Sequence, residues 1–286
     1  MNGIVIVDKP SGWTSQDVVS KLRGVFKTRR IGHGGTLDPM ATGVLPVFVG
    51  RATRGVEFFE HAEKTYEAVL RLGVTTDTED TTGTVLEEKP VLVTEQEFLE
   101  VLPRFRGEIQ QIPPMYSALK VNGQKLYDLA RQGKEVERKS RSVTIFRLEC
   151  LEFSGSTARL LVHCSKGTYI RTLCKDIGQA LGCGGCMAAL RRVSAGAYSI
   201  EDAVPLQELV QTECPERYLA GVDTMFARFD KTVLTHNQEK RCRNGNAFSV
   251  TLPEGTYRAY SQSGEFLMLA EVKDGIMATV KSFFEV

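Results

Sequence analysis

The sequence predicts an α+β fold, and three patterns carry that prediction. Residues 64–72 alternate between apolar and polar side chains, which is typical of a half-buried strand. Residues 143–153 and 158–164 have the composition of two further strands joined by a short Ser-Gly-Ser turn. Apolar residues recur at helical spacing over 18–26 and again over 170–181. The chain therefore combines long strands with amphipathic helices.

Composition and charge are those of an ordinary globular protein. Hydrophobic residues make up 42% and charged residues 25% of the 286 positions. That length has room for one large domain and a small one. The formal net charge of +1 does not indicate a general polyanion binder, so a nucleic-acid partner would have to meet local basic patches. The seven scattered cysteines favour reduced thiols in a cytoplasm.

Several classes of protein are disfavoured. The N-terminal residues lack the pattern of a signal peptide, and no apolar run approaches membrane-spanning length. Cys183 and Cys186 form a lone C-x-x-C without the second pair that a structural zinc site needs, so we interpret them as part of a glycine-rich turn. Neither a phosphate loop nor a dinucleotide fingerprint occurs, which argues against a nucleotide-binding enzyme. We expect no metal and no membrane partner.

The N-terminal elements lead into a basic cluster. Residues 4–7 are predicted to form a buried strand, and Thr14 or Ser15 caps the helix that follows. Lys9 taken alone is a solvated turn lysine. The cluster at 27–30 would usually be a solvated face, but its place directly before an unusual loop favours contact with phosphate.

That loop, residues 32–46, is the most distinctive segment of the chain. Its glycines permit positive φ while Pro39 and Pro46 remove donors, so we expect neither regular helix nor central strand. Asp38 is its only carboxylate, and the proline that follows biases its backbone toward extended conformations. Two interpretations stay open on residue chemistry alone: an ordinary turn, or a stiff loop that presents a reactive acid.

The middle of the chain contains signals for loops, a helix and a hairpin. Residues 75–84 are acidic and rich in threonine, and we interpret them as a solvated loop. Thr94 begins a capping box for a helix that continues to Pro103. The Asn122-Gly123 pair predicts a tight hairpin over 119–125, and a short helix closed by a glycine follows.

Four side chains have both a structural and a functional interpretation. Tyr66 could be a core aromatic with its hydroxyl at the rim. Arg171, where the pattern changes from strand to helix, could be a surface arginine. Leu190 could be a strand core residue, and His33 a hydrogen-bonded surface residue.

Beyond residue 230, short apolar runs separated by glycine turns predict a small β-rich domain.

The run from Gly32 to Val47, GHGGTLDPMATGVLPV, resembles the catalytic-aspartate motif of the bacterial tRNA pseudouridine synthase B family. Gly34 departs from the usual form, which has Thr or Ala there, while the Thr-Leu-Asp-Pro core is intact. The resemblance covers most of residues 1–200. The other matching segments are Lys9-Pro10, Lys64-Thr65-Tyr66, the T-D-T-x-D pattern within 75–84, the Pro-Pro-x-Tyr-Ser-Ala-x-Lys stretch at 113–120, Gly167 to Arg171, and Leu190-Arg191-Arg192.

The resemblance implies a role for each candidate residue. Asp38 would be the nucleophile, and Arg171 would pair with it and keep it ionised. Tyr66 would stack on the target uracil, with Tyr169 packed in the same pocket. Leu190 would line the base pocket. His33 would take the place in the RNA stack that the flipped base leaves.

The resemblance also completes the expected architecture and function. Residues 1–229 would form an α+β catalytic domain with a mixed, largely antiparallel sheet, and 230–286 a small barrel-like RNA-binding (PUA-like) domain. The protein would isomerise uridine 55 in the T-loop of tRNA as a cytoplasmic monomer without cofactor. The alternative is a noncatalytic RNA-binding or RNA-folding factor on the same scaffold, which would not need Asp38.

Overall fold

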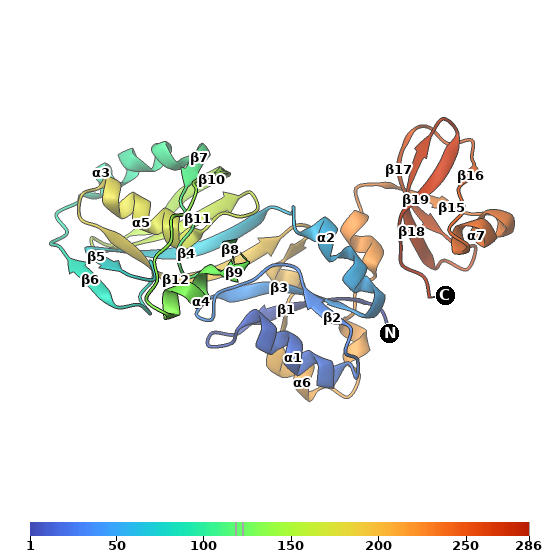
Figure 1. Ribbon diagram of the computed structural model, residues 1–286, viewed down its shortest axis with the longest axis horizontal. Coiled ribbons are helices and arrows are strands. Elements are labelled where there is room, and N and C mark those ends of the chain that lie inside the picture. Colours follow the sequence, from blue (N-terminus) through green and yellow to red (C-terminus); the bar gives the residue numbers. More distant parts are fainter. Residues whose placement is uncertain (118, 122, 286) are drawn as a thin grey trace. The chain divides into compact units, whose positions relative to one another are not determined.

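The chain divides into two compact units. The computed structural model describes residues 1–117, 119–121 and 123–285 (Figure 1). The first unit comprises Met1–Pro39, Val44–Glu60 and Gly196–Val286, and the second comprises Met40–Gly43 and His61–Ala195. Strand β3 (Thr42–Val49) thus begins in the second unit and continues in the first.

The first unit contains a small sheet covered by helices. Strand β1 (Gly3–Lys9) lies between β3 and the short parallel strand β14 (Val204–Pro205), and β2 (Ile31–His33) pairs with β3. Six of the seven residues of β1 are buried, which confirms the buried strand predicted for residues 4–7.

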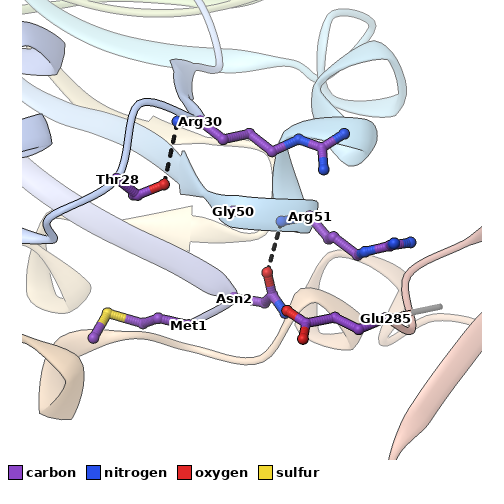
Figure 2. A pocket seen from close by; sticks show the side chains of 7 residues that line it. All are labelled: Met1, Asn2, Thr28, Arg30, Gly50, Arg51 and Glu285. Carbon is purple, nitrogen blue, oxygen red and sulfur yellow. Dashed lines mark hydrogen bonds between the residues drawn. The ribbon is translucent and has the colours of Figure 1, made fainter.

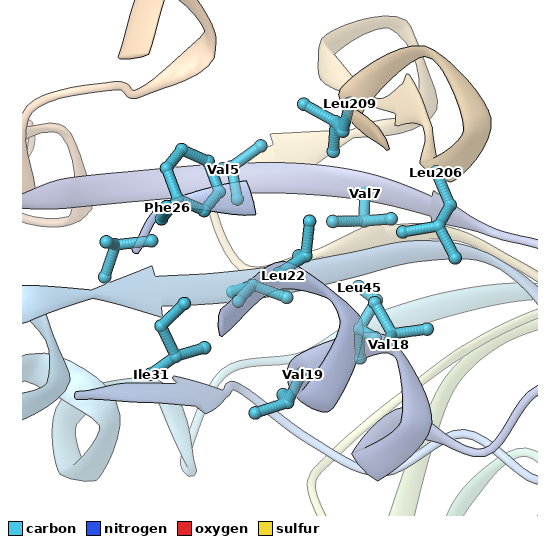
Figure 3. Close-up of a cluster of buried hydrophobic side chains, with 12 residues drawn as sticks. Val5, Val7, Val18, Val19, Leu22, Phe26, Ile31, Leu45, Leu206 and Leu209 are labelled. Atoms are coloured by element: carbon cyan, nitrogen blue, oxygen red, sulfur yellow. The ribbon is translucent and has the colours of Figure 1, made fainter. Parts of the chain in front are cut away.

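Helix α1 (Ser15–Val25) packs on this sheet through its apolar face. Thr14 caps it as predicted: its hydroxyl accepts from the backbone N–H of Asp17, whose carboxylate accepts from the N–H of Thr14. The buried cluster shown in Figure 3 joins α1, the sheet and helix α6 (Leu206–Gln211). Its labelled members are Val5, Val7, Val18, Val19, Leu22, Phe26, Ile31, Leu45, Leu206 and Leu209.

The C-terminal part of the first unit is β-rich, as predicted, and has its own core. Five strands follow the order β15-β17-β18-β19-β16, and helix α7 (His236–Arg243) accompanies them. Leu234, Phe248 and Met277 are among the buried residues of that core. The strands are β15 (Asp230–Val233), β16 (Phe248–Ser249), β17 (Gly255–Tyr260), β18 (Phe266–Lys273) and β19 (Ile276–Ser282).

The second unit is built on an antiparallel sheet with the strand order β12-β4-β11-β10-β7. Its central strand β4 (Lys64–Leu72) has the predicted bounds and alternation. Thr42 and Gly43 of β3 add a parallel pairing with Arg191 and Arg192 of β12. The sheet is therefore mixed and largely antiparallel, as predicted. The other bounds are β7 (Gly107–Gln111), β10 (Arg141–Phe153), β11 (Thr157–Cys164) and β12 (Gly185–Ala195).

The prediction that residues 32–46 form neither regular helix nor a central strand is wrong for Thr42 to Pro46. Gly32 and His33 belong to β2, and the run from Thr42 to Pro46 belongs to β3, which is buried beyond its first residue. Pro46 has no N–H to donate, but its carbonyl keeps a hydrogen bond in this strand: it accepts from the N–H of Gly34 at 2.8 Å.

Shorter elements complete the chain. The predicted hairpin is present, because β8 (Lys120–Val121) and β9 (Gln124–Lys125) pair antiparallel; Asn122 of its turn lies outside the described residues. No helix of the described part is long and apolar enough to span a membrane. The remaining helices are α2 (Val56–Phe59), α3 (Glu95–Val101), α4 (Leu126–Arg131) and α5 (Ile170–Ala180); the remaining strands are β5 (Val74–Thr76), β6 (Val85–Glu88) and β13 (Tyr198–Ser199).

Candidate functional site

The loop that carries Asp38 in the first unit is held on both sides of that residue. On one side, the Ser15 hydroxyl accepts from the N–H of Leu37 at 2.8 Å and donates to its carbonyl at 3.2 Å. On the other side, the Pro39 carbonyl accepts from the N–H of Gly12 at 2.8 Å. Asp38 itself is half-buried. Its backbone position is therefore set by contacts with the start of α1 and with the turn before it.

Lys9 adds a buried cation beneath the same loop. Its Nζ donates to the carbonyls of Pro10 at 2.9 Å, Trp13 at 2.6 Å and Pro39 at 3.2 Å, and the residue has no exposed surface. The interpretation of Lys9 as a solvated turn lysine is wrong, because the ammonium exchanges water for these carbonyls. It ties the turn after β1 to the residue that follows Asp38.

The strand pair below the loop explains the unusual glycine. His33 is half-buried at the end of β2, opposite Val47 of β3. A Cβ added at Gly34 would lie 2.6 Å from the Phe59 ring and 2.9 Å from the Phe48 ring. In this chain two aromatic rings fill the space that a Thr or Ala side chain would need.

In the second unit, Tyr66 and Leu190 are brought together. Ala68 of β4 pairs with Leu190 of β12, and Tyr66 pairs with Arg192, so Tyr66 and Leu190 are diagonal neighbours on one face of the sheet. Both are 8% exposed. The predicted aromatic and aliphatic pair for a uracil pocket therefore has adjacent positions, buried among the core residues of the sheet.

Arg171 occupies the second position of α5 and is buried, so its interpretation as a surface arginine is wrong. Its two terminal nitrogens donate to the carbonyl oxygens of Thr78 at 3.0 Å and Tyr116 at 2.8 Å. Its Nε lies 3.9 Å from Oδ2 of Asp80. Two backbone carbonyls thus fix the orientation of the guanidinium, whose planar fork of donors suits such contacts.

The segment around Asp80 is a folded structure rather than the predicted solvated loop. Thr76, Glu79 and Asp80 are all buried. One carboxylate oxygen of Asp80 accepts from the hydroxyl of Thr78 at 2.8 Å and from both the hydroxyl and the N–H of Thr82, at 2.6 and 2.9 Å. Acidic composition is therefore no sign of solvation here, because the threonines of the T-D-T-x-D pattern satisfy the carboxylate.

Glu79 fastens this folded segment to α5. It has a φ of +64°, rare for a residue with a side chain. Its carboxylate accepts from the Thr172 hydroxyl at 2.7 Å and from Lys175 Nζ at 2.6 Å. On the same helix, burial raises the pKa of Asp176 to about 6, although Lys175 acts to lower it.

Tyr169 stands directly before α5, half-buried. Its backbone N–H donates to the Gln111 side-chain oxygen at 3.0 Å, and its carbonyl accepts from the Gln111 side-chain nitrogen at 3.2 Å. These two hydrogen bonds to the side-chain amide of Gln111 fix the backbone where α5 begins. Sequence reasoning missed Gln111, Ser15, Glu79 and Asp80 as supports of the predicted site residues.

The predicted residues thus fall into two groups. Asp38 and His33 lie in the first unit, while Tyr66, Tyr169, Arg171 and Leu190 lie in the second. The pairing of Asp38 with Arg171 stays a prediction. Within the described part of the chain, no three His, Cys, Asp or Glu side chains gather in a way that could hold a metal ion.

Comparisons with known proteins agree along the whole chain. Residues 23–170 match the model of the TruB family pseudouridylate synthase N-terminal domain. Residues 171–225 match the tRNA pseudouridylate synthase B C-terminal domain.

Curated relatives of this chain share the name tRNA pseudouridine synthase B. The tRNA pseudouridine synthase B of Clostridium kluyveri is 42% identical over 99% of this chain and 100% of its own length. The protein of the same name from Dechloromonas aromatica is 49% identical over 89% of this chain and 85% of its own.

Solved structures agree in fold. A chain of a Cbf5-Nop10-Gar1 complex is 26% identical with a TM-score of 0.74, covering 99% of this chain and 85% of that one. A chain of an archaeal box H/ACA sRNP Nop10-Cbf5 complex is 25% identical with a TM-score of 0.71, covering 99% and 86%. Family models, relatives and fold lead to one conclusion: the chain belongs to the TruB family of pseudouridylate synthases.

Proposed function

We propose that this protein isomerises uridine to pseudouridine at position 55 in the T-loop of tRNA. The observation that carries the proposal is the intact Thr-Leu-Asp-Pro core in a loop held on both sides of Asp38. A noncatalytic RNA-binding factor on this scaffold would have no use for a carboxylate fixed in this way. The relatives named tRNA pseudouridine synthase B support the same activity.

The reaction is an isomerisation, so its atoms balance without a second reactant. The bond from uracil N1 to the ribose C1′ breaks, the base rotates, and C5 bonds to C1′. The proton on C5 leaves and N1 ends with a proton. No electron is gained or lost overall, and we propose that the chemistry needs no cofactor or metal.

We assign the acid in this chemistry to Asp38, as the nucleophile. A carboxylate with an ordinary pKa of about 3.9 is ionised at neutral pH, and a guanidinium beside it favours that form further. We assign that guanidinium to Arg171. Its buried position and its two carbonyl contacts support the assignment, because they hold the group in one orientation before RNA arrives.

The remaining assignments concern the base. A uracil stacked inside folded RNA must be swung out, which costs a few kcal/mol. We propose that Tyr66 stacks on the extruded base, with Leu190 and Tyr169 lining the same pocket, and that His33 fills the vacated stack. The diagonal placement of Tyr66 and Leu190 on one sheet face supports the first part.

We propose that the RNA partner is the T arm of tRNA and that the protein acts as a cytoplasmic monomer. We further propose that residues 230–286 form an RNA-binding domain. The separate five-stranded sheet with its own core supports a distinct domain there.

Release of the C5 hydrogen tests the proposal directly. With tRNA labelled at uracil C5, wild-type protein should release label, and Asp38→Asn should release at least about 10³-fold less because the amide is a poor nucleophile. RNA affinity should stay within a few-fold. Glu213→Gln, which removes an exposed carboxylate of the first unit outside residues 230–286, is the control and should behave as wild type.

The outcomes separate the candidate functions. Equal release by wild type and Asp38→Asn would remove Asp38 from the chemistry. Tight tRNA binding with no release by the wild type would favour the noncatalytic factor. Mapping the modified nucleotide in the released product decides the position.

A further inference from the structure

A hollow on the first unit brings two arginines together. It has a volume of about 370 Å³ and is lined by Met1, Asn2, Thr28, Arg30, Gly50, Arg51 and Glu285. Arg30 is exposed and Arg51 half-buried. Figure 2 shows their side chains extending to the same side from neighbouring points of the backbone.

Two hydrogen bonds hold the backbone at this point. Arg30 directly precedes β2 and Arg51 follows β3 by two residues, and the N–H of Gly50 donates to the Arg30 carbonyl at 2.8 Å. Gly50 has a φ of +65°, and a Cβ there would lie 2.3 Å from Oδ1 of Asn2. That same Oδ1 accepts from the N–H of Arg51 at 2.7 Å. The fold therefore holds the two arginine stems side by side.

Neither guanidinium is used by the fold. Within residues 1–117, 119–121 and 123–285, the side chains of Arg30 and Arg51 have no hydrogen-bond or ion-pair partner. The acid in the hollow, Glu285, accepts instead from the Asn2 side-chain nitrogen at 2.9 Å. Two unpaired forks in one hollow match an anion with several oxygens, such as a phosphodiester.

The hollow also has a fixed relation to the Asp38 loop. Strands β2 and β3 pair from Ile31 and Val49 to His33 and Val47. The arginines stand at one end of this pair and the loop leaves from the other. Arg30 and His33 are three positions apart, which is about 10 Å along a strand. A group bound by the arginines is therefore held at a fixed distance from the Asp38 loop.

We propose that Arg30 and Arg51 form a binding site for a backbone phosphate of the RNA substrate. The proposal rests on the proposed function, because it takes tRNA as the ligand. In this proposal the two arginines bind the RNA and position it on the protein, and they take no part in the chemical step. Glu285, as the acid of the site, opposes binding and limits affinity for RNA in general.

Salt-dependent tRNA binding tests the site. Arg30→Ala and Arg51→Ala should each weaken tRNA affinity about fivefold at 0.1 M salt and reduce the slope of log Kd against log salt by about 1. The single-turnover rate at saturating tRNA should match wild type. Arg104→Ala, at an exposed arginine of the second unit, controls for loss of charge and should change neither quantity.

Glu285→Gln gives a test in the opposite direction. Glutamine keeps an oxygen for the contact with Asn2 and removes the negative charge, so tRNA should bind about two- to threefold more tightly. This gain should vanish in the Arg30→Ala/Arg51→Ala background. Unchanged affinity and slope in that double variant, in a preparation that isomerises tRNA normally, would overturn the site but leave the proposed function standing. A wild type that binds tRNA without isomerising it would overturn the proposed function instead.

Discussion

At the scale of single residues, two buried cations act on backbone carbonyls. Lys9 donates to three of them and Arg171 to two. A carbonyl carries only a partial charge, so these contacts leave most of the positive field of each cation in place. Arg171 in addition has Oδ2 of the buried Asp80 at 3.9 Å from its Nε. In both cases a hydrogen bond joins residues far apart in the sequence, Lys9 with Pro39 and Arg171 with Thr78.

Lys9→Met tests the first of these cations. The methionine fills similar space but leaves the carbonyls that Lys9 served without their donor, and we expect a loss of about 2–4 kcal/mol in stability. Turnover should fall further than tRNA affinity, because the carbonyl next to Asp38 is released. Lys21→Met, on the exposed face of α1, is the control. Thermal unfolding and label release measure the two effects, and equal behaviour of both variants would contradict the argument.

Asp176 gives a prediction about pH. Burial raises the pKa of its carboxyl to about 6 in the folded protein, against an ordinary value of about 3.9 when unfolded. Its contribution to stability is therefore full below about pH 4 and is lost as the pH rises through 6. Asp176→Asn should be more stable than wild type by about 1 kcal/mol at pH 7.5, after allowance for partial solvent exposure.

The gain in melting temperature from Asp176→Asn should be about 2–4 °C at pH 7.5 and clearly smaller at pH 5. Thermal unfolding at the two pH values measures it. A gain that is the same at both values would show that loss of the charge is not its cause.

At the scale of elements, the β2 and β3 pair connects packing with the Asp38 loop. Gly34→Ala should destabilise the protein by about 1–3 kcal/mol, because the new methyl group meets the rings of Phe59 and Phe48. Gly32→Ala is the matched control, since a Cβ there meets nothing within 4 Å. Phe59→Leu in the Gly34→Ala background should restore part of the loss. Chemical denaturation measures all of these, and equal cost at both glycines would refute the explanation.

Elements set by local pattern could be predicted from the sequence. Strand β4 has the predicted bounds, and the Thr14 cap and the hairpin at β8 and β9 are present. The burial of the segment from 76 to 82 could not be predicted, because the carboxylate of Glu79 accepts from Thr172 and Lys175, which lie 93 and 96 positions away. Likewise, the sequence does not reveal that Pro46 lies in a buried strand, where its carbonyl accepts from the N–H of Gly34. Burial of charge is decided by tertiary partners that composition does not reveal.

At the scale of the whole molecule, a net charge near zero does not exclude local basic patches. The net charge is +1, yet exposed fields decay within about 8 Å at physiological salt, so distant acids do not cancel a basic cluster. In α7, Arg241 donates to the Ala247 carbonyl and Arg243 pairs with Glu239, at 2.8 Å in each case. These two basic side chains of α7 are thus engaged within the fold. Lys240 is exposed and has no such contact within the described part of the chain.

Lys240 therefore tests whether the C-terminal β-rich part binds RNA. If residues 230–286 contact tRNA outside the T arm, Lys240→Glu should weaken affinity for whole tRNA about three- to tenfold and leave affinity for an isolated T-arm hairpin unchanged. The rate of label release from the saturated hairpin should equal that of wild type, because Asp38 and its supports are untouched. Binding of both RNAs at several salt concentrations measures the difference. An equal loss for both RNAs would place Lys240 on the T arm, and no loss for either would remove α7 from the RNA-binding surface.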